Sequence, residues 1–219
     1  MRQTDSQIQQ AVLREFKWDT RVEETDVGVE VDAGVVTLTG TVTSWAKKIA
    51  AQQASHRVVG VLEVANDIVV KVPGSVGRTD TEIAQAVRYA LEWNVFVPES
   101  RISSTVSNGW VTLEGDVDYW SQSDDAEKAV RNLAGVVAVT NLIAVKPPKG
   151  VSREVQKAIE EALERQAERE AKRIDLDVKD GRVSVSGIVH SWAERAAVIG
   201  AAKGTRGVRE VDDHLHIVP

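Results

Sequence analysis

Apolar residues recur along the chain with two different periods, and segments with one period alternate with segments of the other. Some segments carry an apolar residue every fourth position, typical of an amphipathic helix, and others carry one at every second position, typical of a half-buried strand. The order of these segments predicts helix, strand, strand, alanine-rich helix and strand, three times over. The first helices carry the series Ile8, Val12, Phe16; Ile83, Val87, Leu91; and Val155, Ile159, Leu163.

The repeat is marked by one motif of glycine, valine and tryptophan, G-x-V-x-(L/V)-x-G-x-V-x-x-W. It occupies residues 34–45, 109–120 and 181–192. A later glycine follows the first motif glycine after 26 residues in each copy, at positions 60, 135 and 207. A fixed interval without insertions indicates a tandem array of one structural unit.

These patterns predict an α+β protein of three tandem αββαβ modules: module 1 (residues 1–73), module 2 (78–147) and module 3 (150–219). The short joints between them contain proline and glycine, which typically break helices and strands. In each module, we expect a hairpin to make the first two strands antiparallel and a crossover helix to make the last two parallel. Each module would then be a three-stranded mixed sheet with two helices on one face.

The motif glycines predict structural roles, since none of them forms a phosphate-binding G-x-G-x-x-G or P-loop pattern. Gly34, with its counterparts Gly109 and Gly181, suits a hairpin position with positive φ. We expect Gly40, with its counterparts Gly115 and Gly187, to lie on the inward side of a strand, where a missing side chain lets a helix approach.

The strand motif V-x-L-x-G-x-V and the closing motif G-V-x-x-V-x-N-x-(I/L)-x-V resemble the BON domain, a bacterial module of osmotically inducible and transport-associated proteins. The resemblance covers nearly the whole chain and includes no catalytic signature. It implies a non-catalytic, stress-associated protein that contacts phospholipid surfaces in the periplasm. It also allows a cytoplasmic role, because the family has cytoplasmic members, some of them linked to potassium.

Composition and charge narrow the function classes further. The chain has no cysteine, which excludes disulfides and thiolate chemistry, and its 27 basic and 33 acidic residues give a net charge of −6. We therefore expect no nucleic-acid partner, because phosphate binding needs clustered cations. Neither a secretory signal nor a transmembrane segment is evident. As written, the sequence predicts a cytoplasmic protein, and a removed leader would make it periplasmic.

Tryptophan supplies the candidate contact residues. Trp45, Trp120 and Trp192 each begin the second helix of a module, where an indole can cover the edge of the core or anchor a lipid headgroup layer or a protein partner. Trp110 follows the hairpin of module 2 and has no aromatic counterpart in the other modules. We expect it to contact a partner surface or a neighbouring module.

Two polar clusters are weaker candidates for ion binding. In module 2, Glu114, Asp116 and Asp118 form an outward column of carboxylates, whose oxygens suit Ca²⁺, Mg²⁺ or K⁺. In module 3, His190, His214 and His216 all face outward and could approach one another as ligands of a transition metal. The other modules lack matching residues, so solvent-exposed histidines without a metal are the simpler interpretation, and we expect no cofactor.

The sequence therefore predicts a protein that acts by surface contact with phospholipid or with a protein partner. Two alternatives stay open: a cytoplasmic sensor of an ion or small ligand, such as K⁺ or Ca²⁺, and a purely structural scaffold. No nucleophile elbow, metalloprotease motif or paired-acid motif predicts an enzyme.

Overall fold

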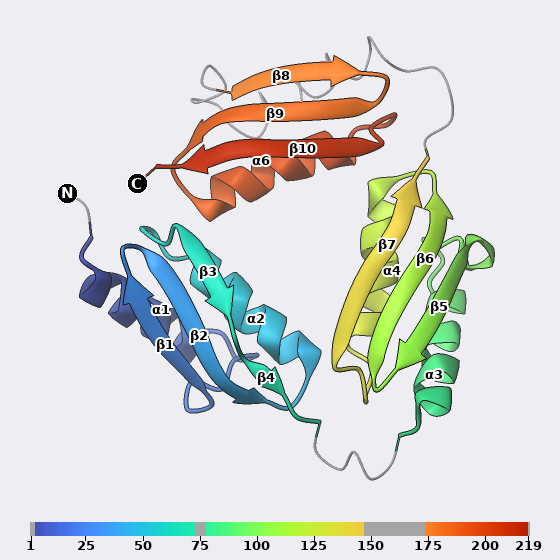
Figure 1. Ribbon diagram of the computed structural model, residues 1–219, viewed down its shortest axis with the longest axis horizontal. Coiled ribbons are helices and arrows are strands. Elements are labelled where there is room, and N and C mark those ends of the chain that lie inside the picture. Colours follow the sequence, from blue (N-terminus) through green and yellow to red (C-terminus); the bar gives the residue numbers. More distant parts are fainter. Residues whose placement is uncertain (1–2, 73–77, 147–173, 219) are drawn as a thin grey trace.

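A computed structural model describes residues 3–72, 78–146 and 174–218 of the chain. Its described residues form three separate mixed sheets, one in each module (Figure 1). In each sheet the middle strand pairs antiparallel with the strand before it and parallel with the strand after it. This confirms the α+β class and the repeated strand topology. The first helix expected in module 3, with Val155, Ile159 and Leu163, lies outside the described residues.

The elements follow the expected order. Module 1 contains α1 (Asp5–Trp18), β1 (Val27–Asp32), β2 (Val35–Val42), α2 (Trp45–His56), β3 (Glu63–Asn66) and β4 (Val69–Val70). Module 2 contains α3 (Asp80–Glu92), the 3-10 turn η1 (Glu99–Arg101), β5 (Ile102–Ser107), β6 (Trp110–Val117), α4 (Trp120–Arg131) and β7 (Ala138–Val145). Module 3 contains β8 (Ile174–Lys179), β9 (Arg182–Val189), α6 (Trp192–Gly204) and β10 (Glu210–Ile217).

The last strand of module 1 differs from its counterparts because it is divided. β3 and β4 both pair parallel with β2, and residues 67 and 68 interrupt the strand between them. The corresponding strands β7 and β10 are continuous. Module 1 thus has a four-stranded sheet by count, with the expected three-strand topology.

The first helices of modules 1 and 2 begin at capping boxes. Thr4 and Thr79 are N-caps, and each forms a capping box with the residue three positions later, Gln7 and Glu82. The next residue links the helix to the hairpin of its module. In module 2 the Asp80 carboxylate accepts hydrogen bonds from the backbone N–H groups of Asn108, at 2.8 Å, and Gly109, at 2.9 Å. Asp5 does the same in module 1.

Replacing Asp80 by alanine is expected to destabilise module 2 by about 1.5–3 kcal/mol, because both hairpin N–H groups lose a charged acceptor. Asp80→Asn keeps one acceptor oxygen and should cost about half as much. Hydrogen exchange of the β5–β6 peptides in denaturant measures the change, with module 1 peptides as the internal control. Equal protection in all three proteins would show that the hairpin does not depend on this carboxylate.

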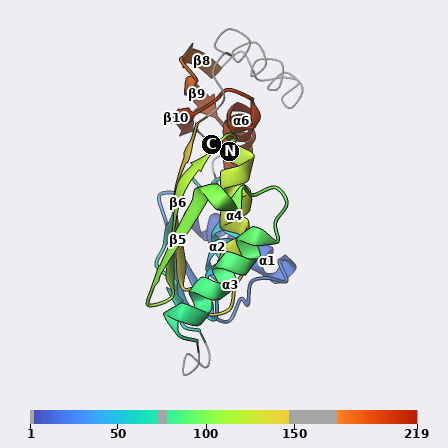
Figure 2. The same ribbon diagram turned by 90° about the vertical axis from the view of Figure 1, so that its right-hand side faces the viewer.

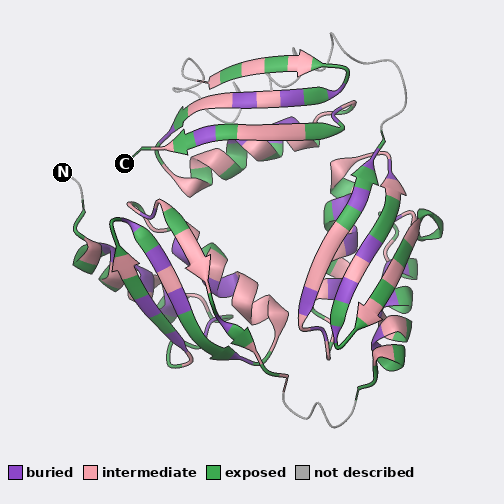
Figure 3. Ribbon diagram, in the orientation of Figure 1, coloured by how far each residue is buried: buried purple, intermediate pink, exposed green. Residues whose placement is uncertain are grey.

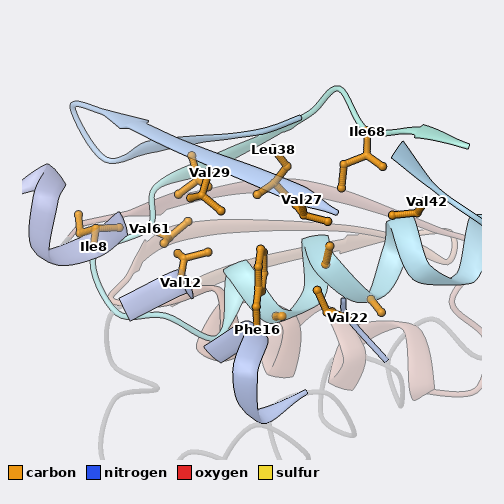
Figure 4. Packing of buried hydrophobic residues seen from close by; sticks show 14 residues of the cluster. Ile8, Val12, Phe16, Val22, Val27, Val29, Leu38, Val42, Val61 and Ile68 are labelled. Atoms are coloured by element: carbon orange, nitrogen blue, oxygen red, sulfur yellow. The ribbon is translucent and has the colours of Figure 1, made fainter. Parts of the chain in front are cut away.

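Within the described residues, helices cover one face of each sheet, and no helix covers the other face (Figure 2). Buried residues alternate with more accessible ones along the strands (Figure 3), and the buried ones belong to clusters that include helix residues. In module 1 the core is built from the α1 series with Leu38 of β2 and Val61, all nearly inaccessible (Figure 4). Separate buried clusters occupy modules 2 and 3. Hydrophobic burial therefore stabilises each module around its own core.

The hairpin glycines behave as predicted. Gly109 has φ +76° after Asn108 at φ +51°, and Gly181 has φ +80° after Asp180 at φ +49°. Two consecutive residues with positive φ are the geometry of the tight hairpin turn that Asn-Gly and Asp-Gly favour.

For Gly40 and Gly115, the expected cause, the approach of a helix, was wrong. Gly40 is exposed and has φ +123°, and no helix atom is among its nearest neighbours. A Cβ atom there would lie 2.1 Å from the backbone oxygen of Asp26, the residue before β1. Gly115 meets the backbone oxygen of Arg101 at the same distance. The glycine is needed because the neighbouring chain passes too close for a side chain, and because φ is positive.

Candidate functional site

A group of highly exposed apolar side chains lies at the end of α3 and just after it in module 2. Trp93, Val95 and Phe96 are 85%, 89% and 70% exposed, and Tyr89 lies one helical turn before Trp93 and is also exposed. We call these four residues the aromatic loop. Exposed apolar side chains that lie close together in the sequence of a monomeric protein often mark a surface for a partner, a ligand or a membrane.

The aromatic loop is held in place by its own polar and buried atoms. The Asn94 side-chain oxygen accepts a hydrogen bond from the backbone N–H of Phe96 at 3.1 Å, and the Asn94 carbonyl accepts one from the N–H of Val97 at 3.0 Å. Val97 is buried in the module 2 core. Anchored on both sides, the turn presents Val95 and Phe96 to solvent instead of folding them inward.

Charge is absent from the loop itself. Residues 93–98 read Trp-Asn-Val-Phe-Val-Pro, and the nearest cation on the helix, Arg88, forms an ion pair with Glu92. The loop would therefore bind a partner through apolar contacts and hydrogen bonds of the indole N–H, and electrostatic attraction would contribute little.

Module 1 has a reduced version of this site. Trp18 ends α1 and is 84% exposed, but the next residue, Asp19, accepts hydrogen bonds from Arg21 and Arg57. These bonds, with that from Arg21 the stronger, hold the pKa of Asp19 well below its usual value. A single indole beside an ion-paired carboxylate replaces the apolar run of module 2. The corresponding part of module 3 lies outside the described residues.

Trp120 and Trp192, expected either to cover the edge of a core or to anchor an external partner, each contact another module of the chain. The indole of Trp192 packs against the module 1 core, and its Nε1 donates a hydrogen bond to the Leu62 carbonyl at 3.0 Å. Trp120 packs against both the module 2 and module 3 cores. They are half-buried because helix N-termini meet neighbouring modules here, an arrangement that one sequence does not reveal.

The two other predicted tryptophans stay at least partly accessible. Trp45 is half-buried at the start of α2, with the Lys48 ammonium 5.7 Å from its ring centre. Trp110 is exposed on the open face of its sheet, where its Nε1 donates to the Thr140 hydroxyl at 2.8 Å. The exposed apolar group of module 2 is thus centred on Trp93, which the sequence marks only as the end of a helix.

The acidic column of module 2 already has basic neighbours. Arg101 forms ion pairs with Asp116 and Asp118, and Lys146 lies 3.6 Å from Asp116. The hydrogen bond from Arg101 holds the pKa of Asp116 below its usual value. With two of its three carboxylates paired, the column does not offer the free set of oxygens expected from Glu114, Asp116 and Asp118.

The histidines of module 3 do not assemble into a ligand set. His214 and His216 are exposed on β10, as the alternation predicts, whereas the Nδ1 atom of His190 lies 2.9 Å from the Val218 carbonyl. Within residues 3–72, 78–146 and 174–218, no group of three or more His, Asp or Glu side chains could hold a metal ion.

None of the helices in the described ranges combines the length and the apolar character that a membrane span requires.

Comparison with known proteins places the chain among its relatives. It is 31% identical over 148 residues to osmotically-inducible protein Y of Escherichia coli (strain K12), a match that covers 65% of this chain and 73% of that protein. A solved structure, the C-terminal domain of CdsD from the type III secretion system of Chlamydia trachomatis, aligns over 96% of both chains at 14% identity. Its TM-score of 0.28 is too low to indicate a shared overall arrangement.

The family comparison agrees with the repeat found in the sequence and with the three sheets of the fold. The BON domain matches three times, at residues 4–72, 79–147 and 152–219, which together account for nearly the whole chain. The protein therefore belongs to the BON domain family and is built of three BON domains in tandem.

Proposed function

We propose that this chain is a non-catalytic, stress-associated protein that contacts phospholipid membrane surfaces, and that module 2 makes the contact through the aromatic loop. The observation that carries the proposal is the outward projection of Trp93, Val95 and Phe96 from a fixed turn. The similarity to a protein named for its induction by osmotic stress supports the stress association. The ion-sensor alternative has no comparable support, because Arg101 pairs with the acidic column.

A lipid surface fits the shape and chemistry of the loop. The group projects from the end of a helix, and Trp and Tyr rings favour the headgroup layer, where one edge is apolar and the other is hydrated. Full burial of a Val or Phe side chain contributes about 1.5–3 kcal/mol, so partial insertion of several residues supports reversible binding.

The experiment is co-sedimentation of the full chain with vesicles of phosphatidylcholine, alone or mixed with phosphatidylglycerol. We expect binding to both compositions, and changing NaCl from 0.1 to 0.5 M should alter it less than about twofold, because screening acts on charges that the loop lacks. Trp93→Ala and Phe96→Ala should each weaken binding about tenfold, the equivalent of about 1.4 kcal/mol.

The matched control is Trp110→Ala, which removes an exposed indole from the sheet face of the same module. It should leave vesicle binding unchanged. Absence of pelleting with either composition would refute membrane contact. Pelleting that survives both loop substitutions would place the contact elsewhere, and binding only to anionic vesicles would show that charge drives it.

A further inference from the structure

Trp192 of module 3 contacts module 1. The ring of Trp192 stacks on the imidazole of His56, with ring centres 4.0 Å apart and an interplanar angle of 12°. Its Nε1–H is satisfied by the Leu62 carbonyl. The indole belongs to the hydrophobic cluster of module 1 and is absent from the cluster of its own module among the described residues. Trp192 is therefore placed to hold modules 1 and 3 together, outside the core cluster that the described residues of module 3 form.

Module 2 contacts module 3 through the equivalent tryptophan, Trp120, which also packs against the core of its own module. The Lys203 ammonium lies 4.6 Å from the ring centre of Trp120. Lys203 follows its motif glycine, Gly181, by 22 residues, the same interval that separates His56 from Gly34. In both contacts, the tryptophan that starts a second helix thus meets the end of the second helix in another module. Figure 1 shows the start of α4 beside the end of α6, and the start of α6 toward the end of α2.

These two contacts have a common direction, from module 2 to module 3 and from module 3 to module 1. Since modules 1 and 2 are joined by the chain, the Trp192 contact closes the three modules into a ring. It links residues 130 positions apart in the sequence and involves no covalent bond. Loss of this contact would leave module 3 attached through the module 2 side alone.

The two contacts differ in their charge. Trp192 already has the Arg195 guanidinium 4.7 Å from its ring centre, and Arg195 is paired with Asp213 at 2.9 Å. In module 2, Ser123 stands at the place of Arg195, three residues after the tryptophan, so Lys203 is the cation that Trp120 meets. A charged His56 would bring a second cation to the Trp192 ring, close to Arg195.

We propose that Trp192, His56, Leu62 and Arg195 form a releasable clasp, which closes the ring of three modules at neutral pH and opens when His56 gains a proton.

The direction of the pH effect follows from the surroundings of His56. Burial, and next the charge of Arg195 from module 3, lower the pKa of His56 below its ordinary value, and the stacked Trp192 ring covers one face of the imidazole. The adjacent cation Arg57 is engaged with Glu15 and Asp19. Because the pKa is lower in the closed state, the open state binds a proton more readily. The closed form is therefore fully favoured above about pH 6.5 and loses this advantage as the pH falls through the lowered pKa.

The absence of cysteine from the chain allows a direct test. Cysteines introduced in the full chain at Thr41 of module 1 and Asp175 of module 3, both exposed, can carry donor and acceptor dyes. We expect energy transfer between the modules to fall as the pH is lowered from 7.5 to 5.0. Trp192→Ala should give low energy transfer at both pH values. Its circular dichroism spectrum should stay that of the folded protein.

Two variants separate protonation of His56 from general acid effects. His56→Phe keeps an aromatic stack that cannot titrate, and it should hold the high transfer value at pH 5.0. Arg195→Ser copies module 2 and should reduce the pH response. Unchanged transfer in Trp192→Ala at pH 7.5 would overturn the clasp, and a wild-type value that does not change with pH, or an equal acid response in His56→Phe, would overturn its release by His56.

Discussion

Replacing Gly40 by alanine is expected to unfold module 1 and leave module 2 folded. The new Cβ atom would lie 2.1 Å from the Asp26 carbonyl oxygen, and that oxygen also accepts the 3.2 Å hydrogen bond from the N–H of Thr41. The two chain segments cannot separate without losing this bond. The positive φ adds strain of about 1–3 kcal/mol, and overpacking typically adds a similar amount. A domain of this size has a total stability of only about 5 kcal/mol.

Hydrogen exchange followed by mass spectrometry distinguishes the modules within one chain. Peptides from β1 and β2 should lose protection in Gly40→Ala, while those from β5 and β6 keep it. Gly200→Ala is the matched control, because its Cβ atom meets nothing within 4 Å and it lies inside α6. That change should stabilise the helix by about 0.5–1 kcal/mol. Full protection of module 1 in Gly40→Ala would contradict the crowding argument.

Local patterns were sufficient to predict most of the fold. Periodicity, capping boxes and turn residues act over a few positions, so Thr4, Thr79 and the Asn108-Gly109 pair predict helix starts and a hairpin that the structure confirms. The repeat strengthened each prediction, because the same order appears in all three copies. The sequence did not predict why residue 40 must be glycine, because the crowding atom belongs to Asp26, just before the neighbouring strand β1.

The candidate site was harder to predict than the fold. Trp45, Trp120 and Trp192 occupy equivalent positions, but the surroundings of each depend on the neighbouring module, which the sequence of one repeat does not contain. Trp93 had a usable signal in the uncharged run Trp-Asn-Val-Phe-Val. Val97 is buried while Val95 and Phe96 are exposed, and this division depends on the turn around Asn94. Periodicity cannot assign burial within so short a segment.

Replacing Phe16 by alanine is expected to destabilise module 1 by about 3–5 kcal/mol, the usual cost of removing a fully buried aromatic ring. Phe16 is 1% exposed and lies between α1 and the rest of the module 1 core, so the cavity would open inside the module (Figure 4). Urea denaturation monitored by hydrogen exchange of α1 and β2 peptides measures the loss.

Phe16→Leu provides the control, because Leu91 occupies the equivalent place in α3, also 18 residues before its motif glycine. Leucine keeps most of the apolar contact, and the change should cost about 1 kcal/mol. Since each core is separate, protection of the module 2 core strands should stay at the wild-type level in both variants. Equal losses in modules 1 and 2 would instead show that the three modules unfold as one cooperative unit, held together by contacts such as that of Trp192 with His56.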